Sequence, residues 1–391
     1  MPGVVTPGSV AEVSSALRDA GGRAVVARGA GTKLDWGSRP RRCDLVVDLS
    51  RLDRILDHAA GDMVVRVQAG VPLHRLMERV AGAGQQLAVD VPGYDDGTVL
   101  DAGTVGGALA VAAGGPRRLR YGGLRDLLLG VTVVRADGAV AASGGRVVKN
   151  VAGYDLGKLL CGSYGTLGVV VEAFLRLHPV PAATGWVLAT APDPAGGYRR
   201  ARALLDSQLA PSAVEVDRAG AGEPVTVAAM FEGTAGGVAT RASAAAQLTG
   251  GAVVAGPPGW FGRFPGGPGG TLVEVSFPPA GLAGVLDLVA EAAGRAGVAA
   301  PVRGGAGGAT LHIGLAPEES PVAVVDFVSR VRAGCVAHEG SAVVRHAPDP
   351  VRDRMDLWGP VHPGTLALMR RVKDQFDPDH RLAPGRFVGG I

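Results

Sequence analysis

The amino-acid sequence predicts an α+β fold whose second part carries an antiparallel sheet built from two βαββαβ units. Three observations lead to this prediction. In the first 180 residues, short β-branched runs and amphipathic helices follow one another without the strict βαβ alternation of a parallel sheet. Two prolines, Pro179 and Pro181, then make a step typical of a domain boundary. Beyond that step, one order of strands and helices can be read twice.

The first part of the chain contains both helices and strands. Ser9 can cap a helix that runs to about residue 20, where two glycines follow. A second helix is expected at 72–80, because proline is favoured near a helix start. Strands are expected where apolar and β-branched residues gather, at 24–27, 45–47, 63–67, 131–136 and 169–177.

The second part repeats one order of six elements: strand, helix, two strands, helix and strand. The first copy is read at 186–190, 198–209, 213–216, 225–231, 235–248 and 252–255. After the Gly/Pro-rich loop 256–270, the second copy is read at 272–277, 282–293, 298–302, 310–315, 322–331 and from 336 onward. We therefore expect one antiparallel sheet with helices on one face. A last helix is expected at 360–376, and the chain divides into 1–182, 183–345 and a C-terminal segment 346–391.

Length and composition limit the classes of protein to which the chain can belong. Its 391 residues fit two or three domains, and 47% hydrophobic with 19% charged residues allow a sizeable core without long disorder. The net charge is only +3, so we expect no nucleic-acid partner. A small cluster of arginines favours a solvated loop or an anion contact; it consists of Arg117, Arg118, Arg120 and Arg125.

The cysteines and the N-terminus bear on location. Cys43, Cys161 and Cys335 lie far apart and form no C-x-x-C pair. This fits a reducing compartment and excludes an iron–sulfur or zinc site made from the cysteines of this chain alone. The first residues lack the features of a signal peptide, and no stretch of about 18 apolar residues occurs. We therefore expect a cytoplasmic chain with no transmembrane segment.

Glycine accounts for 62 residues, and three glycine-rich segments lie in the first part of the chain. The first, 28–33, directly follows an expected strand, and its glycines would let backbone N–H groups surround a diphosphate. A dinucleotide-binding turn of the Rossmann type needs G-x-G-x-x-G at the start of a helix, whereas Leu34 stands at the third glycine position here. Taken alone, this segment is better interpreted as a structural turn.

The other two glycine-rich segments also allow two interpretations. At 103–107, Gly106 and Gly107 at a helix start would offer unpaired N–H groups to an anion, and Thr104 could cap that helix or bind phosphate. Close helix packing through small residues is the alternative. At 162–168, glycines just before a strand indicate a backbone pressed against a flat ligand. Asp155, a little earlier, could simply cap a helix.

The order of these segments resembles a known family. The residues that carry the resemblance are Val148-Lys149-Asn150-Val151-Ala152-Gly153-Tyr154-Asp155-Leu156, Gly162-Ser163-Tyr164-Gly165 and Leu167-Gly168-Val169. With them the chain resembles the vanillyl-alcohol-oxidase family of flavoproteins, and within it the smaller FAD-binding subunits of bacterial glycolate oxidases (glycolate dehydrogenases). The runs 115–118, 123–126 and 383–386 are similar too. The resemblance covers 1–180 and the C-terminal end, whereas the middle agrees in predicted topology only.

The resemblance implies a two-part FAD-binding domain of p-cresol-methylhydroxylase type at 1–182, a cap or substrate domain at 183–345, and a return to the FAD domain at 346–391. FAD would be bound non-covalently, because the first loop lacks the His or Cys through which some relatives bond it. In the family, the first loop holds the diphosphate, the second meets diphosphate and flavin, and the third contacts ribityl, flavin or adenine. The implied cofactor-binding residues are Arg28, Gly29, Ala30, Gly31, Thr32, Lys33, Gly103, Thr104, Val105, Gly106, Gly107, Gly114, Asn150, Gly153, Tyr154, Asp155, Gly162, Ser163, Gly165, Thr166, Gly168 and Val169.

The catalytic residues stay unassigned at this level. Larger, catalytic-type relatives have H-x-G-D-G-N-x-H and E-H-G-[IV]-G motifs, which bring histidines, and often a metal, to the flavin. Only His312 and the pair His338-Glu339 remain of these motifs here. His312 lies in an apolar alternation, as a core or surface histidine would. His338 and Glu339, expected on one strand, would point to opposite faces, so we expect no metal site.

Three functions are compatible with these observations. The first is an FAD-bearing subunit of a glycolate or related 2-hydroxy-acid dehydrogenase, beside a larger FAD subunit and an iron–sulfur subunit, with peripheral membrane association only through these partners. The second is a free-standing FAD dehydrogenase of another 2-hydroxy acid (D-lactate-like) or alcohol, with Arg345, His346 and the arginines near Arg120 as candidates for substrate binding. The third is a non-catalytic flavin-fold assembly subunit, since Ala108 and Ala112 stand where relatives often have Asn.

The Gly/Pro-rich loop 256–270 contains three aromatic residues. Trp260, Phe261 and Phe264 could be exposed at an interface, where aromatic residues are enriched. They could equally form a locally buried cluster.

Overall fold

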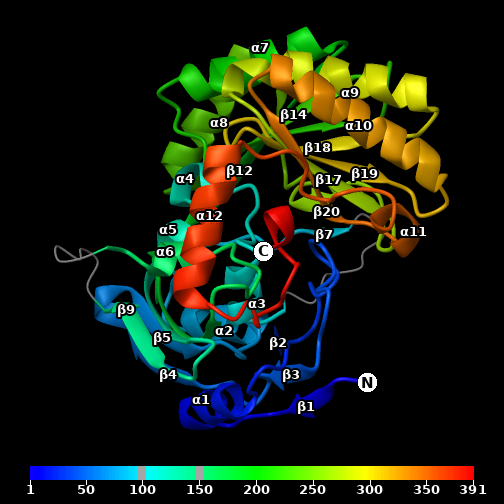
Figure 1. The fold of residues 1–391 in the computed structure, drawn as a ribbon. Helices are drawn as coiled ribbons and strands as arrows, with labels where there is room; N and C mark the ends of the chain where they lie inside the picture. The colour runs from blue at the N-terminus through cyan, green and yellow to red at the C-terminus, as the bar shows by residue number, and fades with distance from the viewer. Residues whose placement is uncertain (95–102, 147–153) are drawn as a thin grey trace.

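The computed structural model describes residues 1–94, 103–146 and 154–391 (Figure 1). The predicted cofactor-binding residues Asn150 and Gly153 lie outside these described residues. The fold combines helices with several sheets, the largest of which is antiparallel, as the sequence predicts. In the described part of the chain, no helix is both long enough and apolar enough to cross a membrane.

Two sheets form the first part of the chain. A parallel sheet has the strand order β1 (Gly3–Val5), β3 (Leu45–Asp48) and β2 (Val25–Arg28). An antiparallel sheet has the order β4 (Ile55–Ala59), β5 (Val64–Gln68), β10 (Val169–Arg176), β8 (Leu128–Val134) and β9 (Val140–Gly144). One apolar cluster joins the two sheets and fully buries Leu17, Val47 and Val171.

Short helices and short ladders complete this part. Helix α1 (Val10–Asp19) begins after Ser9, whose side chain accepts a hydrogen bond from Glu12 N, as predicted. The other helices are α2 (Leu73–Ala81), α3 (Val105–Ala110), α4 (Arg118–Tyr121), α5 (Leu124–Leu127), α6 (Gly157–Leu160) and the 3₁₀ turn η1 (Ala60–Asp62). Two ladders pair β6 (Gln85–Gln86) with β11 (His178–Pro179) and β7 (Gly93–Tyr94) with β16 (Arg263–Phe264). The second ladder ties the loop 256–270 to the first part of the chain.

The second part confirms the repeated order of elements. The first copy is β12 (Ala183–Ala191), α7 (Pro194–Asp206), β13 (Ala213–Arg218), β14 (Val225–Gly233), α8 (Ala235–Thr249) and β15 (Ala252–Val254). The second copy is β17 (Thr271–Ser276), α9 (Leu282–Ala296), β18 (Val302–Gly305), β19 (Thr310–Leu315), α10 (Pro321–Ala337) and β20 (Ser341–His346), with the 3₁₀ turn η2 (Pro279–Gly281) before α9. Their strands form one antiparallel sheet in the order β15-β12-β14-β13-β18-β19-β17-β20.

The large sheet has one apolar and one polar face. Helices α7 to α10 form a layer over its outer face (Figure 1), where Val214 and Val216 of β13 are buried. Because side chains alternate between faces along a strand, Glu215 between these valines faces the first part of the chain. Four more charged or titratable side chains of this sheet line the same cavity as Glu215; they are Glu274, Arg303, His312 and Arg345.

Two expected strand positions are wrong. The strand expected at 298–302 begins only at Val302, because Pro301 has no N–H to give to a ladder. The strand expected from 336 onward begins at Ser341, since α10 continues to Ala337 and buries Cys335 completely. His338 and Glu339 therefore lie in the turn between helix and strand, and not on opposite faces of one strand as expected.

The C-terminal segment lies against the first part of the chain. After α11 (Asp349–Arg352) and α12 (Pro363–Phe376), the chain reaches β2, where Val25 N donates to Arg381 O at 2.8 Å and Ala383 N donates to Val25 O at 2.8 Å. It ends in the 3₁₀ turn η3 (Val388–Gly390). The division at residues 182 and 345 itself stays a prediction.

Candidate functional site

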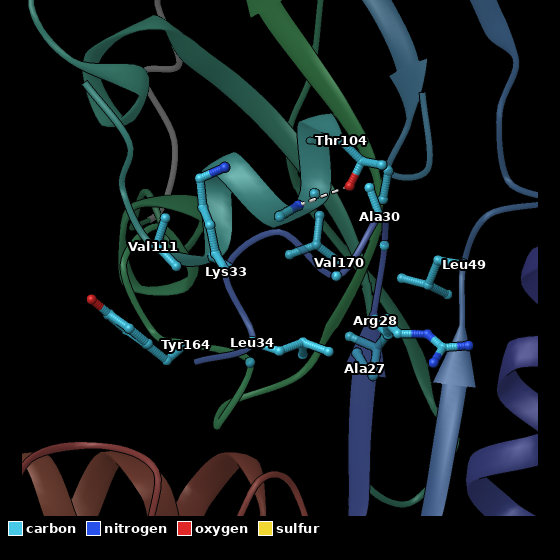
Figure 2. A pocket seen from close by; sticks show the side chains of 18 of the residues that line it. Ala27, Arg28, Ala30, Lys33, Leu34, Leu49, Thr104, Val111, Tyr164 and Val170 are labelled. Carbon is cyan, nitrogen blue, oxygen red and sulfur yellow. Dashed lines mark hydrogen bonds between the residues drawn. The ribbon is translucent and has the colours of Figure 1, made fainter. Parts of the chain in front are cut away.

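The three glycine-rich segments line one cavity, which we call the glycine cavity (Figure 2). It encloses about 750 Å³, including the solvent at its mouth. The residues from the predicted set that line it are Arg28, Gly29, Ala30, Gly31, Thr32, Lys33, Thr104, Gly106, Gly107, Ser163, Gly165, Gly168 and Val169. Segments that are far apart in the sequence therefore meet in one cavity. Three unrelated structural turns would have no reason to meet, so this arrangement favours a common ligand.

The first loop offers backbone donors to this cavity. Within the described residues, the amides of Gly29, Ala30 and Gly31 donate no hydrogen bond to protein acceptors. Gly31 has φ +81°, a backbone conformation that suits glycine and turns successive N–H groups toward one side. Arg28 itself points away, because its Nη2 pairs with Asp48 Oδ2 at 2.6 Å. Figure 2 shows this guanidinium directed away from Lys33.

The second segment supplies the start of helix α3. Thr104 caps this helix, since its Oγ1 accepts a hydrogen bond from Gly107 N at 3.3 Å. A side chain at Gly29 would collide with the same Thr104 hydroxyl, and one at Gly106 would come within 2.7 Å of Ala69 Cβ. Gly106 N donates to Ala69 O at 2.8 Å and Gly107 N to the Thr104 cap, so the unpaired donors expected here are already bonded. Close packing through small residues is the interpretation that the structure supports for this segment.

The third segment forms the opposite wall. Gly165 has φ +76°, and a Cβ built on it would meet nothing within 4 Å in the described residues. Tyr164, a lining residue that the sequence did not single out, has φ +56° and is almost completely buried. Burial raises the pKa of its phenol. The ring lies below Lys33 and Val111 in Figure 2.

Arg386 of the C-terminal segment braces the first loop. Its Nη2 donates to Lys33 O at 2.9 Å and to Leu34 O at 3.2 Å, and it too lines the glycine cavity. Burial lowers the pKa of this guanidinium. In the sequence, the run 383–386 only resembles the family and has no predicted role in the site. The fold is what brings Arg386 to residues 33 and 34.

The remaining predicted residues lie elsewhere. Gly114 lines a second cavity instead, and Thr166 is buried with its Oγ1 donating to Ser163 O at 2.7 Å. Gly103, Val105 and Gly162 lie behind the lining residues, whereas Tyr154 and Asp155 are exposed and outside the lining. A role of these residues in cofactor binding stays a prediction.

The second cavity lies between the first part of the chain and the polar face of the large sheet; we call it the cap cavity. It encloses about 880 Å³, including open solvent, and shares Lys33 and Val111 with the glycine cavity. Its walls carry many glycines and five charged or titratable residues of the large sheet. The two cavities are therefore neighbours, and Lys33 and Val111 contribute to the walls of both.

Arg345 and Glu274 form the strongest ion pair of the cap cavity. Arg345 Nη2 and Nε donate to the two carboxylate oxygens of Glu274 at 2.6 and 3.0 Å, and Arg345 Nη1 donates to Tyr164 Oη at 2.6 Å. Against the effect of burial, Arg345 and His312 hold the pKa of Glu274 far below its ordinary value. All three nitrogens of Arg345 are thus engaged, which weakens its candidacy as a substrate-binding cation.

His312 and His346 have different surroundings. His312 Nε2 lies 3.3 Å from Glu274 Oε2 and its ring packs on Phe264, so it borders the cap cavity instead of being a core or surface histidine. His346 bridges Asp35 Oδ2 at 2.7 Å and Gly270 O at 2.8 Å, and it lines neither cavity. In the described part of the chain, no group of His, Cys, Asp or Glu could hold a metal ion.

The aromatic residues of the loop 256–270 are packed instead of exposed. Phe264 is 3% exposed and contacts Trp36 and Tyr94, while Phe261 packs edge-on against Trp186. The locally buried cluster is therefore the correct alternative of the two.

The glycine cavity fits the diphosphate and ring systems of FAD. Three consecutive unbonded amides supply donors for phosphate oxygens. Leu49, Val111 and Val170 add apolar surface for a flat ring, and none of the described lining residues is a His or Cys.

Comparison with known proteins places this geometry in a family. A model described as "FAD binding domain" matches residues 1–144, and one described as "FAD linked oxidases, C-terminal domain" matches residues 181–387. A crystal structure of alkyldihydroxyacetonephosphate synthase shares the fold, with a TM-score of 0.69 at 16% identity over 97% of this chain and 75% of that one.

Curated relatives match a shorter stretch. D-2-hydroxyglutarate dehydrogenase of Xanthomonas citri pv. viticola is 38% identical over 49% of this chain and 39% of its own length. Glycolate oxidase subunit GlcD of Bacillus subtilis is 32% identical over 54% and 44%, and subunit GlcE of Escherichia coli is 37% identical over 33% and 36%. The matches thus span less than half the length of these relatives. With both of its parts matched by the family models, the chain belongs to the FAD-linked oxidases, and FAD is its cofactor.

Proposed function

We propose that this chain is an FAD-binding oxidoreductase subunit of a 2-hydroxy-acid dehydrogenase, with glycolate as the leading substrate. The observation that carries the proposal is the meeting of three glycine-rich segments in one cavity, next to a second, charged cavity that shares Lys33 and Val111 with it. Relatives named glycolate oxidase subunits, D-2-hydroxyglutarate dehydrogenase and D-lactate dehydrogenase support the substrate class.

The described residues divide the work between the two cavities. FAD, when bound, supplies a two-electron acceptor. The loop 28–33 would hold its diphosphate without a covalent bond, because the described lining residues include no His or Cys. The cap cavity would take the acid and exclude water from it, with arginine side chains to balance the carboxylate.

The complex is the preferred setting. A larger FAD subunit and an iron–sulfur subunit would be the partners, since the three free cysteines of this chain are scattered and cannot hold a cluster together. A cytoplasmic location stays a prediction. A free-standing dehydrogenase of a D-lactate-like acid is the alternative, and the polar cap cavity favours it over a purely structural role.

The test is an anaerobic titration of the purified chain, reconstituted with FAD and followed by its visible spectrum. We expect flavin bands that glycolate, D-lactate and D-2-hydroxyglutarate leave unbleached, and bleaching by one of them after co-expression with a larger FAD subunit from a neighbouring gene. Bleaching of the isolated chain would favour the free-standing enzyme. A chain that FAD cannot reconstitute would contradict both functions.

A further inference from the structure

One side chain of the cap cavity is a buried carboxyl group that makes no hydrogen bond or ion pair with the described residues. Glu215 on β13 is 6% exposed and lines the cap cavity. Within the described residues, its carboxyl group makes no hydrogen bond and no ion pair, whereas Glu232 on the neighbouring strand accepts a hydrogen bond from Tyr121 at 3.0 Å. Burying a carboxyl group without a hydrogen-bond partner lowers the stability of the folded chain. A ligand in the cap cavity could supply the missing partner for Glu215.

The chain makes room for this carboxyl group. Gly305 of β18 pairs with Glu215 across the sheet, and a Cβ there would lie 3.0 Å from Glu215 Oε1. Two charged groups, Arg303 and Asp90, act on this carboxyl group, and each of them is held by a partner of opposite charge. Arg303 on β18 is held by Asp217 at 2.7 Å, and Asp90, before β7, is held by Arg117 at 2.7 Å.

A free cation borders the same glycine turn. Arg118 at the start of α4 lines the cap cavity, and its stem lies 3.7 Å from the position of a Cβ on Gly308. In the described part of the chain its guanidinium makes no hydrogen bond or ion pair. Glu215 and Arg118 thus border one turn, 305–308, which places an acid and a cation within reach of one small molecule.

We propose that the cap cavity binds a small 2-hydroxy or 2-keto acid, with Arg118 on its carboxylate and Glu215 sharing a proton with its 2-oxygen. This deepens the proposed function and rests on it for the substrate class. Burial and the nearby Asp90 carboxylate raise the pKa of Glu215 to about 8, with Arg303 opposing them. At neutral pH the group is therefore mostly a hydrogen-bond donor, which suits the oxygen of a keto acid.

In the oxidative direction, which the proposed function expects only in the complex with a larger FAD subunit, the same group would act as proton acceptor. The O–H bond of the hydroxy acid breaks and its proton moves to the ionised Glu215. The C–H bond would give up its hydrogen with both electrons, for which FAD would be the acceptor, and the carbon–oxygen bond would become a double bond. A carboxyl group with a pKa near the working pH suits both directions of this exchange.

The experiment measures ligand binding, not turnover. Glyoxylate and pyruvate, which cannot give hydride at C2, are titrated into the FAD-reconstituted chain between pH 6.5 and 9.5 by calorimetry and by flavin absorbance. We expect affinity to be constant below about pH 8 and to fall toward tenfold per pH unit above it, because the ionised Glu215 loses its donor and repels the anion. Below pH 8, Glu215 is already protonated, so ligand binding should neither release nor take up a proton there. Above pH 8, each ligand that binds should be accompanied by the uptake of one proton by Glu215. Calorimetry in buffers of different ionisation enthalpy measures this uptake.

Two pairs of variants assign the effect. Glu215→Gln should make the affinity independent of pH over this range, while the control Glu232→Gln should keep the pH dependence of the unaltered chain. Arg118→Ala should weaken binding at least tenfold at every pH, while Arg120→Ala, on the same helix but outside the cavity, should not.

The outcomes separate this proposal from the proposed function. Binding that is equally pH-dependent in Glu215→Gln, or absent from a chain that retains FAD, would overturn the role of Glu215 and leave FAD binding standing. If FAD itself fails to bind, calorimetry still reports keto-acid binding to the chain, and its absence would overturn the inference as well.

Discussion

Gly29 shows how a single missing side chain keeps the glycine cavity open. A Cβ on this residue would collide with Thr104 Oγ1, the cap of α3, so either the loop or the cap must move. Gly29→Ala should therefore weaken FAD binding at least tenfold, about 1.4 kcal/mol. Equilibrium titration of the apo chain with FAD, followed by flavin fluorescence, measures this. Gly22→Ala, which meets nothing within 4 Å in the described residues, is the matched control.

Glu274 makes stability depend on pH in a defined direction. Its pKa in the folded chain lies below the ordinary value of 4.5, so the ionised form is favoured by folding. The stability that it contributes is complete well above pH 4.5 and is lost as pH falls below that value. Glu274→Gln should cost about 3 kcal/mol at pH 7, because Arg345 then stays buried without its partner.

Urea unfolding of the two proteins at pH 7 and at pH 4 measures this difference. The gap in unfolding free energy should be smaller at pH 4. The exposed ion pair Arg202–Asp206 is the control, because solvent screens its charges. Asp206→Asn should change the unfolding free energy by at most about 1 kcal/mol. A gap that grows as the pH falls would contradict the direction derived for Glu274.

At the scale of elements, helix α12 is fixed to the third glycine segment by one buried cation. Lys373 Nζ donates to Thr166 O at 2.7 Å, to Asp377 Oδ2 at 2.6 Å and to Leu382 O at 3.0 Å, and both Lys373 and Asp377 are fully buried. Lys373→Met should destabilise the chain by about 3–5 kcal/mol, since Asp377 stays buried without its cation. It should also weaken FAD binding through the segment 163–168.

Thermal unfolding and FAD titration of the Lys373→Met chain measure both effects. Arg371→Met, an exposed change on the same helix, is the control and should leave both values unchanged. Unaltered FAD affinity in a clearly destabilised Lys373→Met chain would show that α12 supports the fold but not the cavity.

The elements were predictable where local pattern decides them. Ser9 capping, the strand runs and both βαββαβ units follow from turn residues and apolar spacing, and they are confirmed. The end of α10 was not, because burial of Cys335 against the core extends the helix beyond its local signals. The residues of short strands such as β1 and β9 are mostly exposed, so these strands lack the alternation of apolar and polar residues that predicts a strand.

The site was predictable only in part. The glycine-rich segments can be recognised in the sequence by their composition. Tyr164 and Arg386 also line the glycine cavity, but only contacts between distant parts of the chain bring them there. Glu215 had an available signal: in the run 213–217 acidic residues alternate with buried valines, which marks a polar face of a sheet. Its lack of a partner could not be known before the fold.

At the scale of the whole molecule, FAD should stabilise the folded chain by mass action. A free FAD concentration one hundred times the Kd adds about 2.7 kcal/mol to the unfolding free energy. The melting temperature should then rise by roughly 5–10 °C for a domain of the size that holds the glycine cavity. Differential scanning calorimetry of the apo and reconstituted chains checks this, with AMP as a control ligand that lacks the flavin. No shift with FAD would argue against tight non-covalent binding.

The pairing of β13 with β18 joins the two βαββαβ copies at the centre of the large sheet. Two identical units related by a twofold axis would have to make each contact across such a seam twice, residue i with j and j with i, so both sides would carry the same charges. Fusion into one chain removes that restriction. Here the first copy contributes Glu215 and Asp217 and the second contributes Arg303, so the seam carries opposite charges on its two sides. The two halves of the sheet therefore present different charges to the cap cavity. An asymmetric molecule such as a hydroxy acid can then bind there in a single orientation.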